Sequence, residues 1–139
     1  MPDKHVTRDQ RDRFLSACSK SRYPERNTAL SVLMMAPHSL RVGEVCSLKS
    51  WEINTEYGQI YINGVPRPLS QQGIRAVENW RPKRAQMNLP RPVNTLFVSE
   101  RRKPLSRIAI HFMVGQIAEA AGLGYLSIHP EDLRHWSLE

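Results

Sequence analysis

The chain has 139 residues, of which 40% are hydrophobic, 24% charged and 7% aromatic. This length and balance suit a single globular domain over residues 1–139, and no segment is poor enough in apolar residues to predict disorder. No run approaches the roughly 18 apolar residues that a membrane-spanning helix requires, and the polar residues 1–13 do not resemble a secretory signal. We therefore expect a cytoplasmic protein without a membrane partner.

Positive charge dominates, because 20 lysines and arginines against 13 acidic residues give a formal net charge of +7. A field of this sign attracts polyanions, so nucleic acid is the first class of partner to consider and an anionic membrane surface the second. Cys18 and Cys46 lie far apart in apolar helical patterns, and no cysteine or histidine cluster has metal-ligand spacing. We expect two free thiols, no metal and no cofactor.

The first third of the chain predicts three helices. Thr7 and Gln10 form a capping-box pattern that begins a helix over residues 8–19. Pro24 suits the first turn of a second helix, which is apolar on all sides and should form the buried centre. After a short break, residues 40–48 predict a third helix with one apolar face.

Three short stretches of β-type sequence follow, "WEIN", "QIYI" and "VPRPL". The last two are joined by Asn63-Gly64, which is the strongest two-residue signal for a hairpin. Ser70 is suited to cap the next helix, and "RPKRAQMNLPRP" should end that helix through its three prolines. These signals predict a small antiparallel sheet followed by a helix.

The last third predicts a strand, "TLFVSE", a basic turn, "RRKP", and a helix that Ser106 caps and Gly122 ends. His129 and Pro130 begin a final helix, and the two acidic residues that follow favour the positive end of its dipole. The expected fold class is therefore α+β, mostly helical with a small antiparallel sheet.

Two arginines, Arg41 and Arg134, lie just inside predicted helix starts. An arginine grips a phosphate through a planar, two-point fork, so two of them brought together would clamp a phosphodiester. Taken alone, each is more often a solvated or salt-bridged residue at a helix end. The surrounding sequence has to decide between these interpretations.

Residues 38–54, "HSLRVGEVCSLKSWEIN", resemble the first box of the tyrosine recombinase (phage integrase) catalytic domain, which reads Gly-Leu-Arg-x-x-Glu-x-x-x-Leu and leads into a strand. The positions that match in register are Arg41, Glu44 and Leu48. Residues 133–135, "LRH", resemble the end of the second box, His-x-Leu-Arg-His. Order and spacing agree across essentially the whole chain, most nearly with the short fimbrial-switch type that lacks a separate core-binding domain.

The resemblance implies an integrase-like, DNA breaking-rejoining fold that lacks its C-terminal part, with double-stranded DNA as the partner. It implies that Arg41 and Arg134 hold the scissile phosphate while a tyrosine attacks it. The basic runs predict further DNA-binding residues, although each run is as typical of a solvated loop. These candidates are Arg67, Arg81, Lys83, Arg84, Arg101, Arg102, Lys103 and Arg107.

Two departures from the family pattern argue against catalysis. The hairpin contains no lysine to act as the acid for the leaving oxygen, and the guanidinium of Arg67 hardly releases a proton near neutral pH. Glu131 stands where the second box has its first histidine, and an ionised carboxylate there would repel a phosphate or pair with Arg134. His129 lies on a different helical face, so we interpret it as a helix cap rather than a displaced ligand.

A third departure is that the chain ends at Glu139, before the position of the family's nucleophile. The four tyrosines all precede Arg134; they are Tyr23, Tyr57, Tyr61 and Tyr125. We expect that this polypeptide does not perform the family's reaction by the family's mechanism. The closing "SLE" fits either a shortened gene product or an artificial chain end.

Three functions remain open from the sequence. The first is a catalytically inactive, nucleoid-associated DNA-binding protein that regulates recombination or transcription. The second is a fragment of an active recombinase whose nucleophile lies beyond the chain end or comes from another subunit. The third is an interaction module that forms homo-oligomers or inhibits an intact recombinase through an exposed apolar surface. A salt-dependent DNA titration separates the third from the first.

Overall fold

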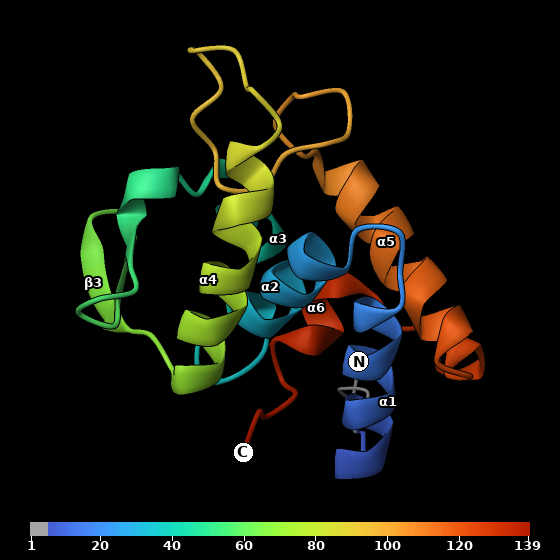
Figure 1. The fold of residues 1–139 in the computed structure, drawn as a ribbon. Coiled ribbons are helices and arrows are strands. Elements are labelled where there is room, and N and C mark those ends of the chain that lie inside the picture. Colours follow the sequence, from blue (N-terminus) through green and yellow to red (C-terminus); the bar gives the residue numbers. More distant parts are fainter. Residues whose placement is uncertain (1–5) are drawn as a thin grey trace.

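The computed structural model describes residues 6–139. The helices are α1 (Arg8–Ser19), α2 (Pro24–Met34), α3 (Val42–Ser47), α4 (Gln71–Ala85), α5 (Arg107–Ala120) and α6 (Pro130–Leu133), with short 3-10 turns η1 (Ser50–Glu52) and η2 (Gly124–Leu126). The strands are β1 (Ile53–Asn54), β2 (Gln59–Ile62) and β3 (Val65–Pro68). Figure 1 shows the strands to one side of a helical body, so the prediction of a mostly helical fold with a small sheet is confirmed.

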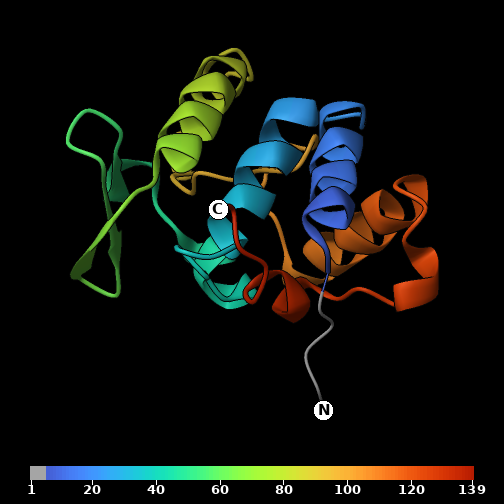
Figure 2. The same ribbon diagram turned by 90° about the horizontal axis from the view of Figure 1, so that it is seen from below.

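Helix α2 forms the centre of the core, as its uniformly apolar second half predicts. Leu30, Leu33 and Met34 are fully buried, and α2 lies between α1 and α4 (Figure 2). Removing a side chain of this size from water contributes about 1.5–3 kcal/mol of stability. The apolar surface of α2 therefore holds the helices on either side of it.

The local signals at the first helix are confirmed in atomic detail. The backbone N–H of Gln10 donates to Thr7 Oγ1 at 3.0 Å, and the Gln10 amide oxygen accepts from the Thr7 N–H at 2.9 Å. This reciprocal pair satisfies two backbone donors that the helix itself leaves open.

The sheet has the strand order β1-β2-β3, and both pairs are antiparallel. Ile62 pairs with Val65, so the turn between β2 and β3 is the predicted Asn63-Gly64. The φ angles of these two residues are 51° and 77°, as a tight hairpin turn with two left-handed residues requires.

Several predicted elements differ in the structure. Only Ile53–Asn54 of "WEIN" is a strand, and the third helix begins at Val42 rather than at residue 40. The stretch "TLFVSE" is not a strand, because it makes only isolated bridges, between Lys49 and Thr95 and between Val98 and Pro104, although its apolar residues are buried. Helix α4 does not stop before the prolines but continues through Pro82. At residues 95–100 and at the end of α4, tertiary contacts override the local signal. The contacts that hold α4 are made by Trp80, Arg81 and Arg84 and are described below.

The chain after α6 returns to the end of α2. The Ala36 N–H donates to the Trp136 carbonyl at 2.8 Å, and the Leu138 N–H donates to the Ala36 carbonyl at 3.0 Å. Trp136 packs edge-on against Phe14 of α1, with 5.3 Å between ring centroids. These contacts fix the closing residues against the turn that leads from α2 into α3. Within residues 6–139, no helix is both long and apolar enough to cross a membrane.

Candidate nucleic-acid interface

The turn between α2 and α3 positions the first candidate arginine. Ser39 adopts the left-handed backbone conformation, with φ of 52°, and the next residue, Leu40, is buried with its N–H on the Leu33 carbonyl at 3.1 Å. Arg41 then becomes the N-cap residue of α3, and its backbone N–H donates to Glu44 Oε1 at 2.8 Å. The Arg41 side chain is exposed.

His38 anchors this turn from inside the protein. Its ring is buried, with Nδ1 3.2 Å from the Val32 carbonyl and Nε2 3.0 Å from the Ser70 N–H. These partners assign the proton to Nδ1, which donates, while Nε2 accepts. Burial lowers the pKa of His38, so the neutral ring joins the end of α2 to the start of α4.

Two distant arginines converge on the carbonyls of this turn. Arg67 of β3 donates from Nη1 to the His38 carbonyl at 3.3 Å, and Arg134 donates from Nε to the Ser39 carbonyl at 3.1 Å. Their acceptors immediately precede Leu40 and Arg41 in the chain. We call Arg41, Arg67 and Arg134 the arginine cluster.

Arg134 lies at the end of a helix, whereas the sequence predicted it near a helix start. Helix α6 has only four residues, and Arg134 is its C-cap rather than a residue of its first turn. The return of the closing residues to Ala36, described above, brings this end of α6 beside Ser39. Ser39 Oγ also donates to the Arg134 carbonyl, at 2.8 Å.

Arg107 lies near the cluster as well. It is the first residue of α5, and its guanidinium covers Gly43 of α3, where an added Cβ would lie 2.5 Å from Nη2. Gly43 is two residues after Arg41. Arg107 therefore adds a positive charge over the first turn of α3, close in the chain to Arg41.

The pairing of Glu131 with Arg134 that the sequence suggests does not occur. Glu131 is exposed and makes no hydrogen bond or ion pair with Arg134, which donates to Ser39 instead. His129 is the N-cap of α6, as expected, but its backbone rather than its ring makes the capping contact, with the Asp132 carboxylate at 2.8 Å.

The basic run of residues 81–84 at the end of α4 contains two arginines that bind backbone carbonyls and one exposed lysine. Arg81 Nη2 donates to the Ser50 and Ile53 carbonyls at 2.8 and 2.7 Å, and Arg84 donates to the Thr95 carbonyl at 2.7 Å. Burial lowers the pKa of both arginines. Together with the indole of Trp80 on the Leu96 carbonyl, these contacts hold α4 past its proline. Of this run only Lys83 is an exposed cation.

The turn of residues 101–103 presents three exposed cations. Arg102 has φ of 63°, and the Ser99 N–H donates to the Lys103 carbonyl at 2.8 Å, which closes the turn. The preceding Glu100 accepts a hydrogen bond from the Tyr23 hydroxyl and forms an ion pair with Arg22 at 3.2 Å. The turn is thereby tied to the start of α2.

None of the four tyrosines is hydrogen-bonded to the arginine cluster. Tyr23 contacts Glu100 as described, Tyr61 Oη is 3.4 Å from Gln59, and Tyr125 accepts from Gln10 at 3.2 Å. Tyr57 is 76% exposed on the loop before β2. The cluster therefore has donors for an anion but no tyrosine hydroxyl bound to it in residues 6–139.

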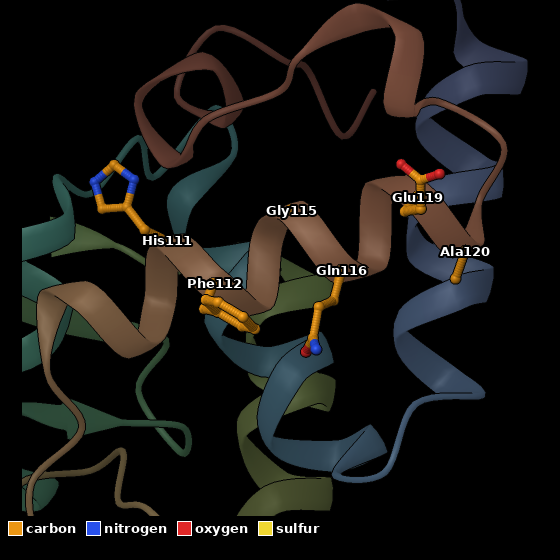
Figure 3. A pocket seen from close by; sticks show the side chains of 6 residues that line it. All are labelled: His111, Phe112, Gly115, Gln116, Glu119 and Ala120. Carbon is orange, nitrogen blue, oxygen red and sulfur yellow. The ribbon is translucent and has the colours of Figure 1, made fainter.

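A hollow of about 640 Å³ lies on the outer face of α5. Figure 3 shows that His111 and Glu119 point to one side of the helix, while Phe112 and Gln116 point to the other. Because these side chains do not converge, the hollow lacks the arrangement of a catalytic site. In the described part of the chain, no group of three or more histidine, cysteine or acidic residues is arranged to hold a metal.

Two residues that support the cluster were not identified from the sequence, His38 and Ser39. Both precede Arg41 within the matched box, and the signal was present at Ser39, which stands where the family pattern has glycine. A serine in a position that calls for a left-handed backbone indicates that its side chain is used.

The mostly helical fold with its small sheet, together with the positions of the two matched boxes at residues 38–54 and 133–135, defines an integrase-type domain. Sequence comparison agrees. The model of the phage integrase family matches residues 4–138. The chain therefore belongs to the phage integrase family.

The individual relatives described next share 28% sequence identity or less with this chain. The type 1 fimbriae regulatory protein FimB of Escherichia coli K12 is 28% identical over 137 residues, which cover 94% of this chain and 66% of FimB. XerA recombinase superposes with a TM-score of 0.81 at 27% identity, over 96% of this chain and 48% of XerA. The Tn1549 transposon integrase, solved with transposon right end DNA, has a TM-score of 0.75 at 18% identity, over 96% of this chain and 52% of that protein. The chain thus spans about two thirds of FimB and half of the solved relatives.

Proposed function

We propose that this chain is a DNA-binding member of the integrase family whose arginine cluster grips a backbone phosphate of duplex DNA. The observation that carries the proposal is the convergence of Arg67 and Arg134 on the carbonyls of His38 and Ser39, just before Arg41. Arg67 and Arg134 come from distant parts of the chain, and their guanidinium groups meet at a half-buried turn that leads directly into the exposed Arg41. A phosphate bound beside this turn would find charge-assisted donors from separate segments of the chain.

The hydrogen bonds within the cluster leave donors for a ligand. Arg134 uses Nε on the Ser39 carbonyl, so its two terminal nitrogens remain to grip a phosphate in a fork. Arg41 makes no side-chain hydrogen bond to residues 6–139 and is exposed. Family relatives add support, because the Tn1549 integrase and the lambda integrase dimer were both solved with DNA.

The same proposal holds that this chain does not cleave DNA by itself. Phosphoryl transfer requires an in-line nucleophile and an acid for the leaving oxygen. No lysine occurs in the β2–β3 hairpin, and no tyrosine hydroxyl is bound to the cluster within residues 6–139. We therefore assign phosphate binding, without cleavage, to the cluster.

A regulatory role follows as the finer part of the proposal. A protein that occupies recombinase or promoter sites without cutting them would compete with active enzymes, and it would be found with nucleoid DNA. The relation to FimB, which is named a regulatory protein, supports this role. The basic turn of residues 101–103 and Lys83 would add phosphate contacts outside the cluster.

The interaction-module alternative has one observation in its favour. Ile108 and Phe112 are 79% and 69% exposed, and their spacing of four places them on one side of α5. This apolar pair offers a surface to a second copy or to an intact recombinase. The alternative differs from the main proposal in requiring no affinity for DNA.

Fluorescence anisotropy with a labelled duplex of mixed sequence tests the proposal. We expect binding that weakens steeply as salt rises, because phosphate contacts release counterions. Arg41→Ala and Arg134→Ala should each weaken binding and lower the salt slope by about 0.9 for each phosphate that the variant no longer neutralises. Arg8→Ala, an exposed arginine on α1, is the matched control and should bind as wild type.

If Arg8→Ala weakens DNA binding as much as the cluster variants do, the arginine cluster contributes only general positive surface charge. Affinity indifferent to salt would favour the interaction module instead. Cleavage is tested separately on a denaturing gel with a labelled nicked duplex. A covalent protein–DNA band that Tyr23→Phe, Tyr57→Phe, Tyr61→Phe or Tyr125→Phe abolishes would contradict the absence of cleavage.

A further inference from the structure

Ser39 stands in a backbone conformation that disfavours it. Its φ of 52° lies in the left-handed region, where a Cβ crowds the backbone and glycine is the comfortable residue. The family pattern has glycine at this position, in the sequence Gly-Leu-Arg, whereas this chain reads Ser39-Leu40-Arg41. A residue kept at a local cost has to be examined for what its side chain does.

The Ser39 side chain and backbone hold Arg134 at both ends. Ser39 Oγ donates to the Arg134 carbonyl at 2.8 Å, and the Ser39 carbonyl accepts from Arg134 Nε at 3.1 Å. The first bond fixes the main chain from which the arginine side chain starts. The second fixes its guanidinium, so the rotatable bonds between them have both ends restrained.

We infer that Ser39 is a positioning residue for Arg134, which orders the guanidinium before a phosphate arrives. This inference rests on the proposed function of the arginine cluster. An arginine that is already ordered loses less conformational entropy on binding, so its affinity for the phosphate is higher. A glycine at this position can supply the carbonyl but not the hydroxyl.

Two substitutions separate positioning from folding. Ser39→Ala and Ser39→Gly both remove the hydroxyl, but only alanine keeps a Cβ in the left-handed backbone, so Ser39→Gly should be the more stable of the two in urea unfolding. If the hydroxyl positions Arg134, both variants bind the labelled duplex about three- to tenfold more weakly than wild type, despite their different stabilities. Wild-type affinity in Ser39→Gly would overturn the inference.

A double-mutant cycle shows whether Ser39 acts through Arg134. In an Arg134→Ala background, Ser39→Gly should produce no further loss of affinity, because the side chain that it positions is gone. The same loss in both backgrounds would assign the effect to something other than Arg134. Ser19→Ala is the control, since Ser19 Oγ also donates to a backbone carbonyl, that of Ser16 at 2.7 Å, but on α1. It should leave affinity unchanged.

A measurement without DNA keeps the two proposals apart. Hydrogen exchange of the Arg134 Nε–H, followed by nitrogen-15 NMR, should be several-fold faster in Ser39→Ala and Ser39→Gly than in wild type. If wild type does not bind the duplex but this acceleration is seen, the proposed function fails while Ser39 still orders Arg134. Unchanged exchange in both variants would overturn the positioning role whatever the DNA result.

Discussion

At the scale of single residues, His38 fixes the turn that receives Arg67 and Arg134. The buried ring accepts from Ser70 and donates to Val32, and its own carbonyl accepts from Arg67. Protonation of Nε2 would place two donors against each other where Ser70 now makes a hydrogen bond. Since burial lowers the pKa of His38, the folded protein keeps the ring neutral.

The stability of the fold should consequently depend on His38 below neutral pH. The folded pKa lies below the unfolded value of about 6.5, so the unfolded chain binds the proton first. The contribution is complete above about pH 6.5 and is lost as the pH falls through the folded pKa. Urea unfolding between pH 7.5 and 5 should show a steeper fall in stability for wild type than for His38→Gln, whose amide does not titrate. Parallel curves would refute a neutral, buried His38.

At the scale of elements, the first turn of α4 is fitted against His38. A Cβ at Gly73 would lie 2.8 Å from His38 Nε2 and 2.8 Å from Leu69 Cδ1, whereas a Cβ at Gly115 of α5 meets no atom within 4 Å. Two glycines inside helices thus have opposite surroundings.

Gly73→Ala should destabilise the fold by about 1–3 kcal/mol, because the methyl group forces the start of α4 away from the ring. Gly115→Ala should stabilise it by about 0.5–1 kcal/mol through better helix propensity alone. Urea unfolding of the pair gives both values under identical conditions. An equal gain at both positions would show that α4 is free to move away from His38.

The basic turn of residues 101–103 depends on a contact outside its own sequence. Tyr23 and Arg22 hold Glu100 at the entrance of the turn. Tyr23→Phe should leave global stability within about 1 kcal/mol, as expected for a surface hydrogen bond. It should accelerate amide hydrogen exchange in residues 99–103 while that of α2 is unchanged. Tyr57→Phe is the control, and equal protection in both variants would mean that the turn orders itself.

At the scale of the whole molecule, the closing residues join the first helix to the central one. Trp136 is 2% exposed, packs on Phe14, and accepts from the Ala36 N–H through its carbonyl. The same segment delivers Arg134 to Ser39, so the fold and the arginine cluster share one set of contacts.

Trp136→Ala should therefore cost about 3–5 kcal/mol of unfolding free energy and weaken DNA binding as well. Calorimetry measures the loss of stability, and the anisotropy titration, at a temperature where the variant remains folded, measures the loss of affinity. A large loss of stability with wild-type affinity would show that Arg134 does not depend on this closure. Leu15→Ala, on α1 and only partly buried, controls for general destabilisation.

Local patterns in the sequence determined much of this protein. The capping box at Thr7, the apolar α2 and the Asn63-Gly64 turn appear as predicted, because each depends on residues within a few positions of one another. The Ser106 cap does as well, since Ser106 Oγ accepts from the Ala109 N–H at 3.1 Å. The matched boxes also identified Arg41 and Arg134 as candidates. Their role in holding a phosphate remains a prediction that the binding experiments test.

Tertiary structure alone decided how the candidate site is assembled. The extension of α4 past Pro82 and the place of Arg134 at the end of α6 depend on partners 11 to 95 positions away in the chain, and so does the irregular course of residues 95–100, which accept several of these contacts. The two hydrogen bonds that bring Arg67 and Arg134 to His38 and Ser39 likewise span 29 and 95 positions. Local sequence carries no information on which carbonyl such a guanidinium will reach, because only packing of the complete core brings these segments together.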